Sequence, residues 1–76
     1  MPIWEMDKVD MRTKILCCVA AFTALGRGEV EFFFKMAHVH KIPKEEVEEI
    51  LLLTGLESGF PNAEMAIEIL ERVYTG

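Results

Sequence analysis

The sequence predicts an all-α fold, an antiparallel bundle of about four helices, in an oligomeric protein. Apolar residues recur at i, i+3, i+4 and i+7 along most of the chain, and glycine or proline interrupts these stretches. The 76 residues are 51% hydrophobic, above the usual range of about 45–50%, although so small a chain buries a modest share of its own surface. We therefore expect one domain over residues 1–76, whose helices bury apolar surface against other copies.

The first helix is predicted over Met6–Leu25. Asp7 and Asp10 near its start complement the positive end of the helix dipole. From Ile15 onward the helix has no polar face, so we expect it to be buried. Gly26 is expected to end it in the left-handed conformation. Before this helix, Trp4 either docks on a neighbouring chain or packs on the protein's own core.

Three more helices are predicted over Glu29–His40, Pro43–Leu56 and Asn62–Tyr74. The second presents an inward stripe of Val30, Phe33, Phe34, Ala37 and His38. In the third, Ile50–Leu53 is apolar on every side and needs cover on every side. Gly55 in that helix costs about 1 kcal/mol relative to alanine, which is tolerable where another helix crosses closely.

Charge and hydropathy exclude several functions. The formal net charge of −5 argues against binding to nucleic acid or to an anionic membrane, which require clustered lysine and arginine. The longest uncharged apolar run, Ile15–Gly26, has roughly half of the ~20 residues that cross a bilayer. The N-terminus lacks a signal-peptide layout. We expect a cytoplasmic protein with two reduced cysteines, no membrane contact and no cofactor.

The order of these elements resembles the carboxymuconolactone decarboxylase and AhpD-like (alkylhydroperoxidase-like) family. The resemblance covers roughly residues 12–73, and it depends on the helix start Lys44-Glu45-Glu46-Val47 and the corner Gly59-Phe60-Pro61. It implies antiparallel helix pairs that assemble as a trimer or hexamer, with peroxidase or decarboxylase activity in catalytic members.

The resemblance also implies that the usual catalytic residues are missing. The Cys-x-x-Cys pair of redox members would fall at Gly26 and Glu29, and the histidine at Phe33. The usual glutamate would fall near Thr13 or Lys14. Because phenylalanine neither takes nor gives a proton, acid–base catalysis at that position is lost.

Cys17, Cys18 and His38 are the remaining candidates for catalysis. Adjacent cysteines on a helix point about 100° apart, so they do not form the geometry of a Cys-x-x-Cys pair. Cys17 and Cys18 are interpreted mainly as apolar filler, with a redox role as the alternative. His38 and His40 also diverge on a helix, which disfavours a shared metal, and we assign no metal site. A structural or surface role is expected for His38, with proton transfer as the alternative.

The aromatic run Phe32-Phe33-Phe34 is interpreted as core and subunit interface. The alternative is an apolar ligand pocket lined by Phe33 and Phe34, with His38 and Thr54 as its nearest polar groups.

Three functions follow. The favoured one is a catalytically degenerate oligomeric protein that acts as a scaffold or binds a small apolar ligand. The alternatives are a thiol-dependent peroxidase using Cys17 or Cys18 and a decarboxylase-like acid–base enzyme using His38.

Overall fold

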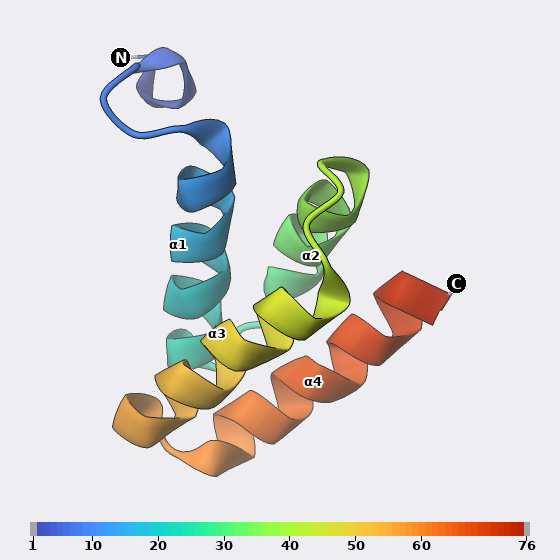
Figure 1. Cartoon of the computed structure of the whole chain (residues 1–76). Helices are drawn as coiled ribbons and strands as arrows, with labels where there is room; N and C mark the ends of the chain where they lie inside the picture. The colour runs from blue at the N-terminus through green and yellow to red at the C-terminus, as the bar shows by residue number, and fades with distance from the viewer. Residues whose placement is uncertain (1, 76) are drawn as a thin grey trace.

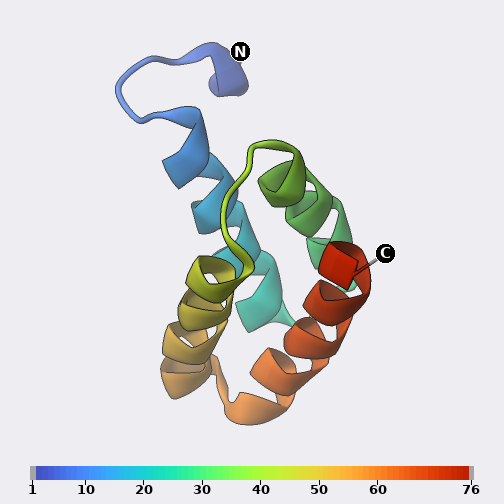
Figure 2. The ribbon, with the colours of Figure 1, turned by 45° about the vertical axis from the view of Figure 1, so that its right-hand side comes forward.

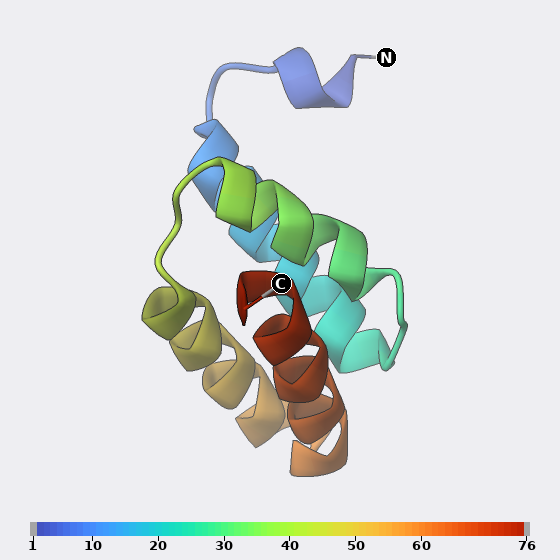
Figure 3. The same cartoon turned by 90° about the vertical axis from the view of Figure 1, so that its right-hand side faces the viewer.

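The computed structural model describes residues 2–75 and confirms the all-α prediction. Its elements are a short 3-10 helix η1 (Ile3–Glu5) and four α-helices: α1 (Met11–Leu25), α2 (Val30–Val39), α3 (Lys44–Ser58) and α4 (Phe60–Thr75). No strand occurs among the described residues. The helices form two antiparallel hairpins, α1–α2 and α3–α4, around a shared core (Figures 1 and 2). Seen from the side, α3 and α4 lie next to each other (Figure 3).

The prediction that the first helix begins at Met6 is wrong, because Asp10 caps it and the helix begins five residues later, at Met11. The backbone of Asp10 is extended, and its carboxylate accepts a hydrogen bond from the backbone N–H of Thr13 at 2.7 Å. Hydrogen bonding from Thr13 also lowers the pKa of Asp10. The preceding residues, including Met6, therefore form a non-helical segment that leads back to η1.

Other helix ends differ from the predictions by one or two residues. Pro43 precedes α3 with an extended backbone (ψ 143°) and does not occupy the first helical position. Helix α3 continues to Ser58, and α4 begins at Phe60, so Gly59 alone separates them. Gly26 confirms the predicted left-handed cap, with φ 69°, and the N–H of Arg27 donates to the carbonyl of Phe22 at 3.0 Å.

The core forms where the four helices meet. Ile42, which lies in the connection between α2 and α3 and outside the predicted helices, is only 2% exposed and joins this core. Tyr74 closes the same region, since its hydroxyl donates to the carbonyl of Ile42 at 2.8 Å. The core residues are Ile15, Val19, Val30, Phe34, Ala37, Ile42, Val47, Leu51, Ala66, Ile69 and Leu70.

Gly55 allows α3 and α4 to approach closely, as predicted. A Cβ atom at this position would lie 3.1 Å from the Cβ of Ala63 and 2.8 Å from the ring of Phe60. Such distances are too short for ordinary contact, so a side chain would push the hairpin apart. Close packing of the two helices explains why a residue with poor helix propensity is tolerated here.

Several large apolar side chains remain exposed on the single chain. We define the α3 patch as Leu52, Leu53, Leu56 and Phe60, whose exposed fractions are 51%, 54%, 69% and 46%. The predicted burial of the first helix on all sides is also not achieved within one chain, because Cys17 is exposed. None of the helices in residues 2–75 is both long enough and apolar enough to cross a bilayer.

Thr23 provides a test of core packing. Its side chain is 1% exposed, and its hydroxyl has no hydrogen-bond partner among the described residues. A buried polar group without a partner costs free energy, and an apolar replacement of similar shape removes that cost. We expect Thr23→Val to raise the free energy of unfolding by about 1 kcal/mol, measured by urea denaturation.

Thr54→Val is the matched control for this prediction. The Thr54 hydroxyl donates to the carbonyl of Ile50 at 2.8 Å, so its removal should give no stabilisation. An equal gain in both variants would show that valine itself, and not the unpaired hydroxyl of Thr23, is responsible.

Candidate functional site

The two cysteines lie on α1 in different environments. Cys17 is exposed and Cys18 is half-buried, and both thiols are free. Burial raises the pKa of the Cys18 thiol, and the neighbouring Cys17 adds to this effect. A raised pKa leaves less thiolate at neutral pH, which makes Cys18 a poor nucleophile.

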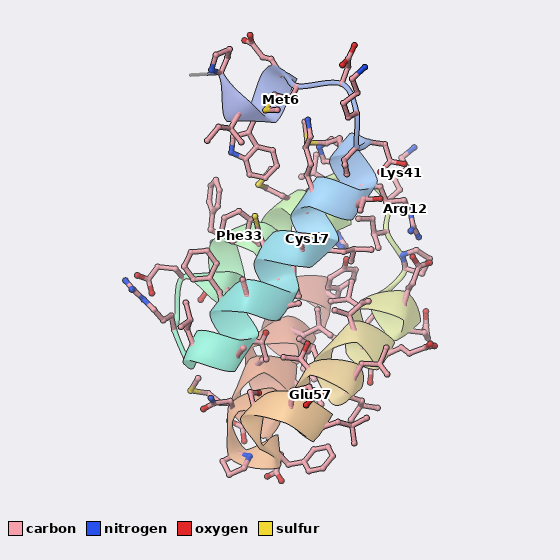
Figure 4. The ribbon with its side chains drawn as sticks, turned by 90° about the vertical axis from the view of Figure 1, so that its left-hand side faces the viewer. Met6, Arg12, Cys17, Phe33, Lys41 and Glu57 are labelled. Atoms are coloured by element: carbon pink, nitrogen blue, oxygen red, sulfur yellow. The ribbon has the colours of Figure 1, made fainter. Side chains whose placement is uncertain are left out.

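Both cysteines line a hollow between α1 and the N-terminal segment, which we define as residues 2–10. We call it the N-terminal hollow, and its volume is about 390 Å³. Figure 4 shows the segment that carries Met6 lying beyond the end of α1, with Cys17 on the face of α1 turned toward the viewer. The lining residues are Ile3, Trp4, Met6, Lys8, Val9, Lys14, Cys17 and Cys18.

The N-terminal segment is attached to the bundle by Lys14 and Trp4. The ammonium group of Lys14 donates to the carbonyl of Trp4 at 3.1 Å and to the carbonyl of Met6. The ring of Trp4 stacks on Phe33, with centroids 6.4 Å apart and an interplanar angle of 18°. Trp4 therefore packs on its own chain, which is one of the two roles considered for it.

Phe33 lies at the centre of an aromatic cluster. It stacks on Phe22 with centroids 5.1 Å apart and meets Phe32 edge to face at 5.2 Å. These contacts, with the stack on Trp4, surround the position where the family resemblance would place a histidine. The ring of Phe33 therefore packs against other aromatic side chains, as expected if it belongs to the core.

The four residues of the predicted ligand pocket have different surroundings. Phe34 is fully buried in the core. Thr54 is half-buried, and its hydroxyl is used within its own helix. Neither the N-terminal hollow nor the second hollow described below is lined by Phe33, Phe34 or Thr54. Their grouping with His38 into one pocket stays a prediction.

His38 lies at the end of α2, away from the cysteines. It is exposed, and its ring meets that of Tyr74 edge to face, with centroids 4.6 Å apart. It lines a second hollow of about 350 Å³, together with Glu31, Lys35, Val39, Arg72 and Val73. A mechanism that couples His38 to Cys17 or Cys18 across one hollow therefore has no basis in this geometry.

Metal ligands do not gather in the part of the chain that the structure describes. Within residues 2–75, no group of three or more histidine, cysteine, aspartate or glutamate side chains is placed to hold a metal ion.

Sequence reasoning missed the hollow itself. The signal was the run of apolar residues at Ile3, Trp4, Met6 and Val9, mixed with charged residues and placed ahead of the capping Asp10. The prediction included Met6 and Val9 in the first helix. It therefore did not identify the run as a separate segment that covers one side of the hollow.

The difference between the cysteines is directly measurable. We expect the Cys18→Ser variant, which keeps Cys17, to react severalfold faster with a chromogenic aromatic disulfide at neutral pH than Cys17→Ser, which keeps Cys18. The rate at Cys18 should continue to rise at higher pH, because its pKa is raised. Equal rates and equal pH profiles would contradict the assigned environments.

Comparison with known proteins finds a curated protein that is similar to this chain. The chain is similar to 4-carboxymuconolactone decarboxylase of Acinetobacter baylyi, with 26% identity over 73 residues, which is 95% of this chain and 54% of that protein. The chain thus spans about half the length of the curated relative it matches. No family profile matches the chain. No solved structure matches it. The match supports the resemblance of this chain to the carboxymuconolactone decarboxylase and AhpD-like family.

Proposed function

We propose that this chain is a self-assembling, catalytically degenerate domain of the carboxymuconolactone decarboxylase and AhpD-like type, which acts as a scaffold or as a module that binds a small apolar ligand. The observation that carries this proposal is the packing of Phe33. An aromatic cluster occupies the position of the expected proton-transferring histidine, and phenylalanine performs no acid–base chemistry.

The other expected catalytic positions agree with this proposal. Gly26 is the left-handed cap of α1, and the carboxylate of Glu29 pairs with Arg27. The backbone N–H of Thr13 is bonded to Asp10. These residues have structural roles and supply neither a thiol nor an imidazole.

Self-assembly is supported by the α3 patch. Its four large side chains are about half exposed or more, and an apolar surface of this kind is typical of a protein–protein interface. Three of them, Leu52, Leu53 and Leu56, are spaced to share one side of α3. The family resemblance favours a trimer or a hexamer.

The catalytic alternatives receive less support. A thiol peroxidase requires an activated thiolate, whereas burial raises the pKa of Cys18. A decarboxylase using His38 would depend on an exposed imidazole at the end of α2. A cytoplasmic location remains a prediction.

Assembly is tested by light scattering. We expect a molar mass of three or six times the 8.7 kDa of one chain at micromolar concentration. The double variant Leu53→Glu/Leu56→Glu should shift the mass towards one chain, because charged side chains resist burial in an interface.

Val39→Glu is the matched control for assembly, since Val39 is 75% exposed and lies on α2. It should leave the mass unchanged. A monomeric unmodified protein, or full assembly of the double variant, would overturn the role of the α3 patch.

The loss of catalysis is tested separately with purified protein. We expect no reduction of alkyl hydroperoxides and no decarboxylation of carboxymuconolactone above the uncatalysed rate. Turnover that disappears in Cys17→Ser/Cys18→Ser would establish the peroxidase alternative. Turnover that disappears in His38→Ala would establish the decarboxylase alternative.

A further inference from the structure

The N-terminal hollow has the volume of a small-molecule site. It measures about 390 Å³, within the range of about 300–1,000 Å³ for known ligand pockets. A cavity of about 150 Å³ holds one benzene molecule, so this hollow has room for a compact molecule of roughly ten to fifteen carbon atoms. It lies between the N-terminal segment and α1 of the same chain, and is therefore not a flat side of a single helix.

Apolar side chains supply almost all of the surface of the hollow. Four of them belong to the N-terminal segment and remain open to water in this chain, with exposed fractions of 62% for Ile3, 40% for Trp4, 53% for Met6 and 46% for Val9. Removing apolar surface of this kind from water is favourable. An apolar molecule in the hollow would cover these side chains and gain that free energy.

Among the described residues, neither lysine of the lining is placed to hold an anion inside the hollow. The ammonium group of Lys14 is already bonded to the carbonyls of Trp4 and Met6. Lys8 is exposed, and a lysine beside apolar surface keeps its ammonium group in water. Because a charge that is buried without a partner is costly, the hollow favours an uncharged ligand over an ion of either sign.

Contacts within the chain hold the wall of the hollow in place without a ligand. The two hydrogen bonds from Lys14 tie the N-terminal segment to α1. The ring of Trp4 stacks on Phe33 of α2, with centroids 6.4 Å apart. Because the segment is already ordered, less conformational entropy is lost when a ligand binds.

We propose that the N-terminal hollow binds a compact, uncharged apolar molecule of roughly ten to fifteen carbon atoms. The molecule would lie against Met6 and Val9 of the N-terminal segment and Cys17 of α1. The site differs from the pocket predicted around Phe33 and Phe34. This inference rests on the ligand-binding alternative of the proposed function, and it adds the location of the site and the size and charge of the ligand.

The charge preference is tested with probes that share the adamantane cage and differ in charge: 1-adamantanol, 1-adamantanecarboxylate and 1-adamantylammonium. Binding to the full chain should be measured by titration calorimetry. We expect adamantanol to bind about tenfold more tightly than either ion, because neither ion finds a partner in the hollow. Adamantanol should also shift the emission of Trp4, which is the single tryptophan of the chain and lines the hollow.

Cys17 provides a second measure of where the probe binds. In the Cys18→Ser variant, Cys17 is the one remaining thiol of the chain. Because Cys17 is exposed and lines the hollow, a bound molecule would cover it. We expect saturating adamantanol to slow the alkylation of Cys17 by iodoacetamide severalfold.

Variants of the apolar wall assign the site to the N-terminal segment. Met6→Glu and Val9→Glu should each weaken the binding of adamantanol about tenfold, since each places a charge in the apolar lining. Leu25→Glu is the matched control, because Leu25 is 68% exposed on α1 and does not line the hollow. It should bind adamantanol as tightly as the unmodified chain.

The outcomes separate the inference from the function beneath it. Equal binding of the three probes would refute the preference for an uncharged ligand. Calorimetric binding that leaves Trp4 emission and Cys17 alkylation unchanged would refute the site, although the ligand-binding function would stand. If no probe binds, the site and the ligand-binding alternative both fail. If Trp4 emission without a probe changes on dilution together with the molar mass, a second copy of the chain fills the hollow and the inference is overturned.

Discussion

The amount of apolar surface in so short a chain governs this structure. Four helices of 10 to 16 residues meet along one core, and each helix has only one side that reaches it. Gly55 increases the contact by letting α3 and α4 approach until a Cβ atom would meet Ala63. Even so, Leu52, Leu53 and Leu56 remain at least half exposed, because a helix that is apolar all round cannot be covered by two neighbours.

The exposed apolar surface falls into two regions with different character. The α3 patch lies near the α3–α4 corner, and the N-terminal segment lies at the opposite end of the molecule (Figure 1). The α3 patch is made of large apolar side chains alone, which suits burial against another protein surface. The N-terminal hollow is lined by apolar side chains, the two cysteines, Lys8 and Lys14.

The aromatic cluster connects α2 with the N-terminal hollow. Phe33 occupies the position of an expected catalytic histidine, and the same ring supports Trp4. Trp4 in turn forms part of the hollow. Phe33 thus provides an apolar platform for the N-terminal segment. His38 and Cys17 remain at the surface, in separate hollows, where neither can assist the other.

Local sequence determined the helices, their order, the left-handed cap at Gly26 and the close crossing at Gly55, because helical periodicity and backbone conformation depend on neighbouring residues. It also showed that Phe33 could not replace a histidine. It misplaced the start of α1, because it did not identify Asp10 as the cap and included the preceding residues from Met6 in the helix, and it missed the burial of Ile42. The N-terminal hollow was decided by tertiary structure alone. Its wall depends on a bond from Lys14 to the carbonyl of Trp4, ten residues away, and on a ring contact between Trp4 and α2. Such contacts form only after the helices pack, and no periodic pattern in the sequence records them.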